Sequence, residues 1–204
     1  MNARVLQPLI NRLKLTPSIT DMIRMDHSHV LATFHRYEPS SRPETKRALV
    51  NTACIALEIH AQCEEEIFYP AMYDVASDVS MIEKSVPEHD EMRRLIVALR
   101  GMQPDDPAYD PTFMDLMRTV IHHVADEETT LLPDAERLLG DRLGELGAQM
   151  TKRKLQLTAP HAGELARNAA RAMPAMSVLF AAGAVIAGGY LVKRTLFSRT
   201  MPVV

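Results

Sequence analysis

One arrangement of residues occurs twice in this chain, and it constrains the fold more than any other feature. In each copy a His is followed by a Glu after four residues and by a Pro after ten. The copies are His60, Glu64 and Pro70, and then His123, Glu127 and Pro133. Residues four apart on an α-helix lie above one another on one face. Each copy therefore places an imidazole beside a carboxylate, as two ligands of one metal ion would be placed.

A further His precedes each copy at nearly the same distance. His27 lies 33 residues before His60, and His89 lies 34 residues before His123. The chain therefore contains two similar helical hairpins, each of which offers a His and then a His-x-x-x-Glu pair. Duplication of a ligand set predicts a two-metal site, with a pair of histidines for each metal and carboxylates that bridge. Iron suits such a centre in a helical bundle best, and manganese and zinc are the alternatives.

Four segments have apolar residues at the three-to-four spacing of helices that bury one face. They lie within residues 18–38, 43–76, 82–99 and 113–131. Aromatic residues make up only 5% of the chain and Trp is absent, so strands are not expected. Short loops favour antiparallel neighbours, so the sequence predicts an all-α, up-and-down four-helix bundle. Counted from the loops, the candidate ligands differ in height by roughly 7 Å at most, so one layer can hold them all.

The pattern His…HxxxE…His…HxxxE, which covers roughly residues 18–140, resembles that of hemerythrin-like HHE cation-binding domains. The resemblance implies a non-haem di-iron centre with bridging carboxylates that binds O₂ reversibly. It also implies a ligand set, in which each iron takes two histidines and the carboxylates bridge. By position these are His27 and His60 at one iron, His89 and His123 at the other, and Glu64 and Glu127 as the bridges.

The sequence departs from oxygen-carrying hemerythrins at two positions. Those proteins have a further His four residues after the His of the third helix, and here that residue is Arg93. Their second carboxylate is an Asp five residues after its His, whereas Glu127 follows His123 by four. Both departures are typical of the broad HHE group rather than of a dedicated oxygen carrier. The first would leave one iron with an open or water-filled position.

Three further residues are expected beside the ligands without binding metal themselves, namely Cys63, Arg93 and His122. Each has a plainer interpretation, as a small core residue, an exposed Arg and a surface His. His29 lies about 200° around its helix from His27 and is expected to face solvent. The competing interpretation of the whole site is four unrelated histidines that are hydrogen-bonded in or beside the core.

The charge is unevenly distributed along the chain. Residues 141–204 hold nine Lys/Arg and three Asp/Glu, which gives +6 and leaves −9 for residues 1–140. An acidic body argues against nucleic acid as the main partner. No secretory signal is apparent at the N-terminus, so a cytoplasmic domain is expected.

The sequence predicts five consecutive parts. They are an N-terminal arm (1–17), the bundle (18–140), a helical linker leading away from it (141–173), an apolar helix (174–192) and a short basic tail (193–204). The apolar helix has 19 residues without a charge and would span roughly 28 Å, about the hydrocarbon thickness of a bilayer. It is expected to anchor the domain to the inner or plasma membrane, and its small residues could pack in a homodimer. The alternative is a hairpin or buried helix that packs on the bundle.

These features predict a metal-cation-binding protein that binds or senses O₂, NO or iron at two non-haem irons. Two other functions stay open. An open iron position could turn over peroxide or NO, which would make the protein a di-iron enzyme. The metal could instead only stabilise the bundle of a membrane-tethered structural adaptor.

Overall fold

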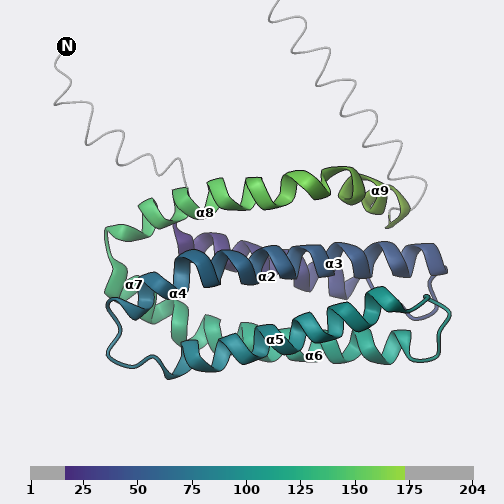
Figure 1. Cartoon of the computed structure of the whole chain (residues 1–204), viewed down its shortest axis with the longest axis horizontal. Coiled ribbons are helices and arrows are strands. Elements are labelled where there is room, and N and C mark those ends of the chain that lie inside the picture. Colours follow the sequence, from purple (N-terminus) through teal and green to yellow (C-terminus); the bar gives the residue numbers. More distant parts are fainter. Residues whose placement is uncertain (1–16, 173–204) are drawn as a thin grey trace, which may run out of the picture.

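The computed structural model describes residues 17–172, and within them it confirms an all-helical fold built on an antiparallel four-helix bundle (Figure 1). The bundle helices are α2 (Ile19–His35), α3 (Pro43–Cys63), α5 (Ser80–Gly101) and α6 (Tyr109–Asp126). Short segments extend α3 and α6, namely η1 (Glu64–Phe68) with α4 (Tyr69–Tyr73), and η2 (Glu127–Leu131) with α7 (Leu132–Leu139). The C-terminal part consists of α8 (Arg142–Thr158), η3 (Ala159–His161) and α9 (Ala162–Ala172).

Local signals fix where the first two helices begin. The Ser18 hydroxyl accepts a hydrogen bond from the Asp21 backbone N–H at 3.1 Å, and the Asp21 carboxylate accepts one from the Ser18 N–H at 3.1 Å. This reciprocal capping box satisfies two donors that a helix otherwise leaves unpaired. In α3, Pro43 occupies the first turn, where a missing N–H costs nothing.

The core consists of two apolar clusters, one toward each end of the bundle. One contains Ile23 and Ile59, and the other contains Val30 and Leu57. On α2 the two clusters are separated by the residues between Ile23 and Val30, which include His27. A polar layer therefore lies between two apolar layers, where little water reaches it.

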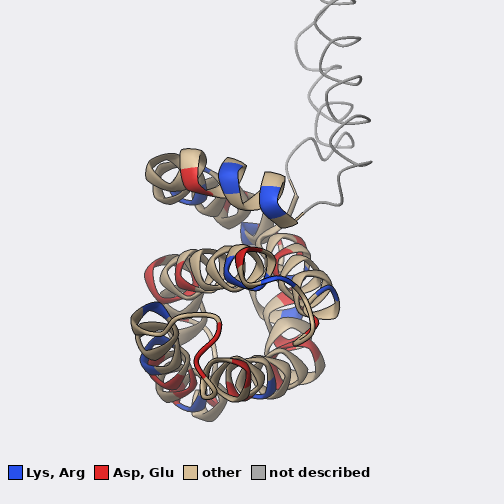
Figure 2. Cartoon of the chain, turned by 90° about the vertical axis from the view of Figure 1, so that its right-hand side faces the viewer, with Lys and Arg blue, Asp and Glu red and all other residues tan. Residues whose placement is uncertain are grey.

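The C-terminal helices pack against the bundle, whereas the sequence analysis expected residues 141–173 to lead away from it. Figure 2 looks along the bundle and shows its four helices in a ring, with the C-terminal helices outside. Leu146 and Met150 of α8 are 6% and 1% exposed, and they belong to the same apolar cluster as Ile19 and Met22. Because α8 is amphipathic, burial of this face against α2 and α3 is more favourable than extension into solvent.

The predicted arm, apolar helix and basic tail lie almost wholly outside the described residues. Of those segments only Pro17, at the end of the arm, is described. Among residues 17–172, no helix combines the length and apolar character that crossing a membrane requires.

A glycine permits the close approach of α8 to the start of α2. A Cβ atom on Gly147 would lie 2.9 Å from the Ser18 carbonyl carbon, 3.0 Å from the Ile19 nitrogen, and closer still to the Pro17 carbonyl oxygen. All three are backbone atoms, which cannot move aside as a flexible side chain could. We expect Gly147→Ala to lower the free energy of unfolding by about 1–3 kcal/mol, as overpacking does.

Gly144→Ala is the matched control for this prediction, because a Cβ there would meet no atom within 4 Å. It should stabilise α8 by up to about 1 kcal/mol through helix propensity. Urea denaturation of both variants measures the difference. Equal stability of the two variants would show that α8 does not lie against α2 at this point.

Candidate metal centre

The six residues singled out as ligands meet in one buried layer of the bundle. They are His27 on α2, His60 on α3, Glu64 at the start of η1, His89 on α5, His123 on α6 and Glu127 at the start of η2. Their exposed fractions range from 0 to 6%. Charged or polar side chains are rarely buried to this extent unless they are paired or bind a metal.

The histidines form two close pairs, and each carboxylate contacts one histidine of each pair. The ring centroids of His27 and His60 are 5.0 Å apart, and those of His89 and His123 are 4.6 Å apart. Glu64 Oε2 lies 3.2 Å from His60 Nε2 and 3.4 Å from His89 Nε2. Glu127 Oε2 lies 3.3 Å from His27 Nε2 and 3.5 Å from His123 Nε2. Both carboxylates therefore lie between the two pairs.

These separations fit the spacing of atoms that bind one ion. Ligand atoms about 2.1 Å from a tetrahedral ion lie about 3.4 Å from each other. Two overlapping groups of four residues each have ligand atoms that all lie within 4.8 Å of one another. They are His60, Glu64, His89 and His123, and then His27, His60, Glu64 and Glu127. His60 and Glu64 belong to both groups.

Several atoms at the centre lack the hydrogen bonds that buried polar atoms normally make. These are His27 Nε2, His60 Nε2, Glu64 Oε1 and Glu127 Oε2. Buried polar atoms without partners are rare, and each requires an explanation. All four atoms have lone pairs that a cation can accept, so the residues present fit a metal ion.

An outer carboxylate faces the other nitrogen of each histidine. His27 Nδ1 lies 2.8 Å from Glu128, His89 Nδ1 2.9 Å from Glu65, and His123 Nδ1 3.0 Å from Glu88. His60 Nδ1 lies 3.7 Å from Asp26. An ionised carboxylate only accepts hydrogen bonds, so it keeps the proton on Nδ1 and leaves the Nε2 lone pair free for metal.

The sequence analysis did not assign these four carboxylates to the centre, although their positions repeat. Asp26 and Glu88 directly precede the first His of each hairpin, and Glu65 and Glu128 directly follow the candidate bridging Glu residues. The repetition of both acidic positions was a usable signal. The sequence could not predict which carboxylate faces which histidine, because each of these contacts joins different helices.

The outer carboxylates allow a direct test. Glu88→Gln keeps the side-chain shape but removes the charge that faces His123, and we expect metal affinity to fall about 10- to 100-fold. Glu91→Gln, on the same helix, removes a carboxylate that pairs only with Arg94 on the surface, and should leave affinity unchanged. Competition with a chromogenic chelator measures both. Equal affinities for the two variants would mean that Glu88 does not support a metal ligand.

A tyrosine that follows the first HxxxE pair also reaches the centre. Tyr69 is 2% exposed, and its hydroxyl donates to Glu127 at 3.0 Å and lies 3.3 Å from Glu64. Burial and the two carboxylates raise the pKa of Tyr69 far above its usual value, so the phenol keeps its proton. The equivalent residue of the second hairpin is Leu132, nine residues after its His, so the two halves differ here.

A π-helical turn begins at the Glu of each HxxxE pair. In both places the backbone bonds span five residues, from the Tyr69 N–H to the Glu64 carbonyl and from the Leu132 N–H to the Glu127 carbonyl. Pro70 and Pro133 follow directly and cannot donate the next bond of a regular helix. Such π-turns are rare and frequently mark functional sites.

Burial and close packing shift the protonation of the centre in the absence of metal. Burial lowers the pKa of His60 to about 4. Burial also disfavours charge on His27, but the nearby carboxylate of Glu127 outweighs this effect and raises the His27 pKa to about 9. Burial and the neighbouring Glu127 raise the pKa of Glu64 well above its usual range. The centre therefore holds protons where a cation would supply positive charge instead.

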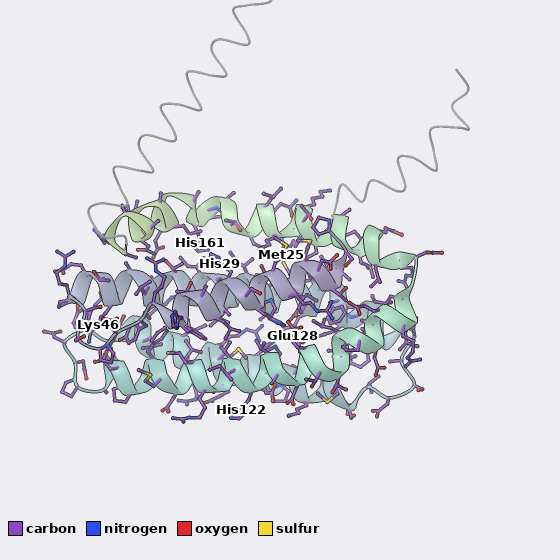
Figure 3. All side chains as sticks on the ribbon, turned by 180° about the vertical axis from the view of Figure 1, so that it is seen from behind. Met25, His29, Lys46, His122, Glu128 and His161 are labelled. Carbon is purple, nitrogen blue, oxygen red and sulfur yellow. The ribbon has the colours of Figure 1, made fainter. Side chains whose placement is uncertain are left out.

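The three other residues that were expected beside the ligands, Cys63, Arg93 and His122, have three different surroundings in the structure. Arg93 binds both oxygens of Glu65 at 2.7 Å, so it reaches an outer carboxylate and not a central one. Cys63 is buried next to Glu64 in sequence, and burial raises the pKa of its thiol to about 11. His122 lies on the exposed outer side of α6, and His29 is exposed on α2, as Figure 3 shows.

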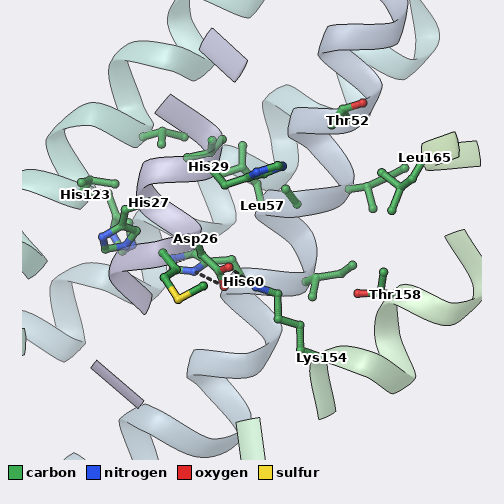
Figure 4. Close-up of a pocket in the computed structure, with 17 residues that line it drawn as sticks. Asp26, His27, His29, Thr52, Leu57, His60, His123, Lys154, Thr158 and Leu165 are labelled. Carbon is green, nitrogen blue, oxygen red and sulfur yellow. Dashed lines mark hydrogen bonds and ion pairs between the residues drawn. The ribbon is translucent and has the colours of Figure 1, made fainter. Parts of the chain in front are cut away.

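A cavity of about 350 Å³ adjoins one side of the centre (Figure 4). His27, His60 and His123 line it together with aliphatic side chains of α2, α3 and α6. Lys154 and Thr158 of α8 and Leu165 of α9 complete the wall. The C-terminal helices therefore border the space through which small molecules could approach the histidines.

Comparison with known proteins agrees with this geometry. A protein of Nostoc sp. (strain PCC 7120 / SAG 25.82 / UTEX 2576) named DNA nickase is 30% identical over 114 residues, which are 56% of this chain and 32% of that protein. This chain therefore spans about a third of that relative. The crystal structure of an HHE cation-binding-domain protein from Mycobacterium kansasii superposes with a TM-score of 0.61 at 19% identity, covering 74% of this chain and 98% of that one.

The model of the hemerythrin HHE cation-binding domain matches residues 18–135, which contain all six central side chains and all four outer carboxylates. The match covers more than half of the chain. It ends before α8 and α9, which lie beyond the residues that the family model matches. By the order of its motifs, its bundle and this match, the chain belongs to the hemerythrin HHE cation-binding domain family.

Proposed function

We propose that the chain holds two iron ions in the buried layer and binds a small diatomic molecule, O₂ or NO, at them. The observation that carries this proposal is the position of the two carboxylates. Glu64 and Glu127 each contact one histidine of each ring pair, as carboxylates that bridge two ions would. The proposed ligands are His27 and His60 for one ion, His89 and His123 for the other, with Glu64 and Glu127 between them.

The protein would contribute orientation and exclusion of water. The outer carboxylates hold the imidazole rings with Nε2 turned inward. The apolar clusters above and below the layer keep water away, which favours ions that are neutralised by protein ligands. Iron with free coordination positions supplies reversible binding of small molecules and redox chemistry.

The cavity supports a small apolar ligand. Apart from Asp26, Lys154 and a few hydroxyl and imidazole groups its wall is apolar, which suits O₂ or NO better than polar metabolites, because uncharged diatomic molecules need no hydrogen bonds in transit. His27, His60 and His123, which line it, would hold such a molecule beside both histidine pairs.

Tyr69 favours a second candidate, an enzyme that acts on peroxide or NO. Its buried hydroxyl keeps its proton and donates a hydrogen bond to Glu127, and a fixed donor of this kind can stabilise negative charge that develops during a reaction at the centre. Tyr69→Phe should slow such turnover without lowering metal content. Unchanged turnover in this variant would remove the reason for preferring an enzyme.

The deciding experiment is metal analysis of the purified chain, with optical spectra recorded without oxygen and then in air. About two irons per chain, with a near-ultraviolet band that appears in air and fades on degassing, would support reversible binding. A single irreversible change would support the enzyme and make peroxide and NO assays the next step. Zinc alone, or no metal, would overturn the proposal.

We propose further that the domain is cytoplasmic and is tethered to a membrane through residues 174–192. The support is the uncharged stretch itself, with Arg171 before it and Lys193 after it. Fractionation of cells that express the full chain and a form ending at residue 172 tests this. Equal amounts of both forms in the membrane fraction would contradict it.

A further inference from the structure

Each outer carboxylate of the metal centre also meets a cation. Glu128 accepts from Arg24 at 3.1 Å, Glu65 from Arg93 at 2.7 Å, and Glu88 lies 3.6 Å from Lys84. Asp26 is in direct contact with Lys154. The centre is therefore surrounded by four contact rows, each of which runs from a histidine to a carboxylate to a cation.

One of the four contact rows takes its cation from a different part of the protein than the others. Arg24 is on α2, and Lys84 and Arg93 are on α5, so three cations belong to the bundle itself. Lys154 is on α8, beyond residues 18–135, where the family match ends. Helix α8 thus supplies a contact from outside the residues that the family model matches.

The same contact row also has the longest distance between its carboxylate and its histidine. The Asp26 carboxylate lies 3.7 Å from His60 Nδ1, whereas the other three carboxylates lie 2.8 to 3.0 Å from their histidines. Asp26 contacts Lys154 through Oδ1 and faces His60 with Oδ2, so the lysine and the histidine hold opposite oxygens of one carboxylate. Figure 4 shows this row of Lys154, Asp26 and His60 along the wall of the cavity.

From this geometry we propose that Lys154 is a positioning residue of the metal centre, and that α8 is thereby a working part of it. Lys154 holds the Asp26 carboxylate toward His60, and Asp26 in turn keeps the His60 ring turned with Nε2 inward. The inference rests on the proposed metal function. It goes further, because it makes the stability of the loaded centre depend on a helix outside the residues that the family model matches.

The orientation of the His60 ring should matter for both ions of the proposed centre. His60 belongs to both groups of candidate ligands, so a ring free to rotate would weaken the whole centre. Without Lys154, the Asp26 side chain, which is 15% exposed, would keep only its long contact with His60 and could turn into the cavity. Loss of an outer partner of a metal-bound histidine costs about 10- to 100-fold in affinity, and a residue one step further out should lie near the lower end.

The test uses the full chain loaded with iron(II) without oxygen, and measures the rate at which a chelator removes the metal. We expect Lys154→Met to release iron about 10-fold faster than the unmodified protein, and Lys154→Arg to stay close to it. The matched control is Arg153→Met, which removes another ion pair between α8 and the bundle, to Glu66 at 2.6 and 2.8 Å, with no histidine behind it. Arg153→Met should release iron at the unmodified rate.

Asp26→Asn separates positioning from a general loosening of α8. If Lys154 acts through Asp26, Lys154→Met should add nothing to Asp26→Asn, because coupled residues are not additive. Equal release from Lys154→Met and Arg153→Met, or an undiminished effect of Lys154→Met in the Asp26→Asn protein, would overturn the inference. An unmodified protein without iron would overturn the proposed function instead, so the two failures are distinguishable.

Discussion

Replacing His60 by alanine is expected to lower the metal content from about two ions per chain to less than one. His60 Nε2 lies within reach of both groups of candidate ligands, so its loss removes a ligand from each. His123 belongs to one group only, and His123→Ala is expected to retain more metal than His60→Ala. Elemental analysis of proteins purified under identical conditions measures the difference.

His29→Ala is the control for these variants. His29 lies two residues after His27 on the same helix, but it is exposed and belongs to neither group. Its removal should leave the metal content unchanged. Full occupancy in both His60→Ala and His123→Ala would refute the ligand assignment and leave a core lined with hydrogen-bonded histidines.

Removal of the metal is expected to lower the thermal midpoint of unfolding by roughly 5–15 °C. A ligand present at 100 to 1,000 times its dissociation constant stabilises the folded state by about 2.7–4.1 kcal/mol, and 1 kcal/mol shifts the midpoint of a chain of this size by about 2–4 °C. The physical source is the buried layer, where Glu64 and Glu127 are 0% exposed and lack full hydrogen bonding. A cation supplies the missing partner.

Differential scanning calorimetry with and without a chelator measures this shift. His60→Ala provides the control, since a protein that has lost its metal should not respond to the chelator. A midpoint that the chelator leaves unchanged in the unmodified protein would mean that the layer is stable without a cation. That result would also argue against a structural adaptor whose bundle is stabilised by the metal.

Much of the candidate centre could be predicted from the sequence because its proposed ligands obey local helical geometry. His60 and Glu64, like His123 and Glu127, lie one turn apart on one face, so their spacing alone specifies their relation. The repeated hairpin adds His27 and His89 at matching heights. Spacing of this kind survives any reasonable packing of the four helices.

The outer contacts could not be predicted in the same way. Glu128 faces His27 across 101 residues, and Lys154 meets Asp26 across 128, so neither contact leaves a local pattern. Tyr69 reaches Glu127 only because a π-turn at Glu64 displaces it by one residue relative to a regular helix. The packing of α8 depends on a face that the sequence shows to be apolar, but whose partner only the assembled bundle provides.

The sequence by itself therefore determined the fold class, the order of the helices and the six central residues, because helical periodicity carries that information along a single segment. The tertiary structure decided which carboxylate faces which histidine, which cation supports each carboxylate, and that α8 returns to the bundle. Those relations depend on the rotation and separation of helices that are distant in the chain. Such quantities are set by side-chain packing, which no spacing of residues encodes.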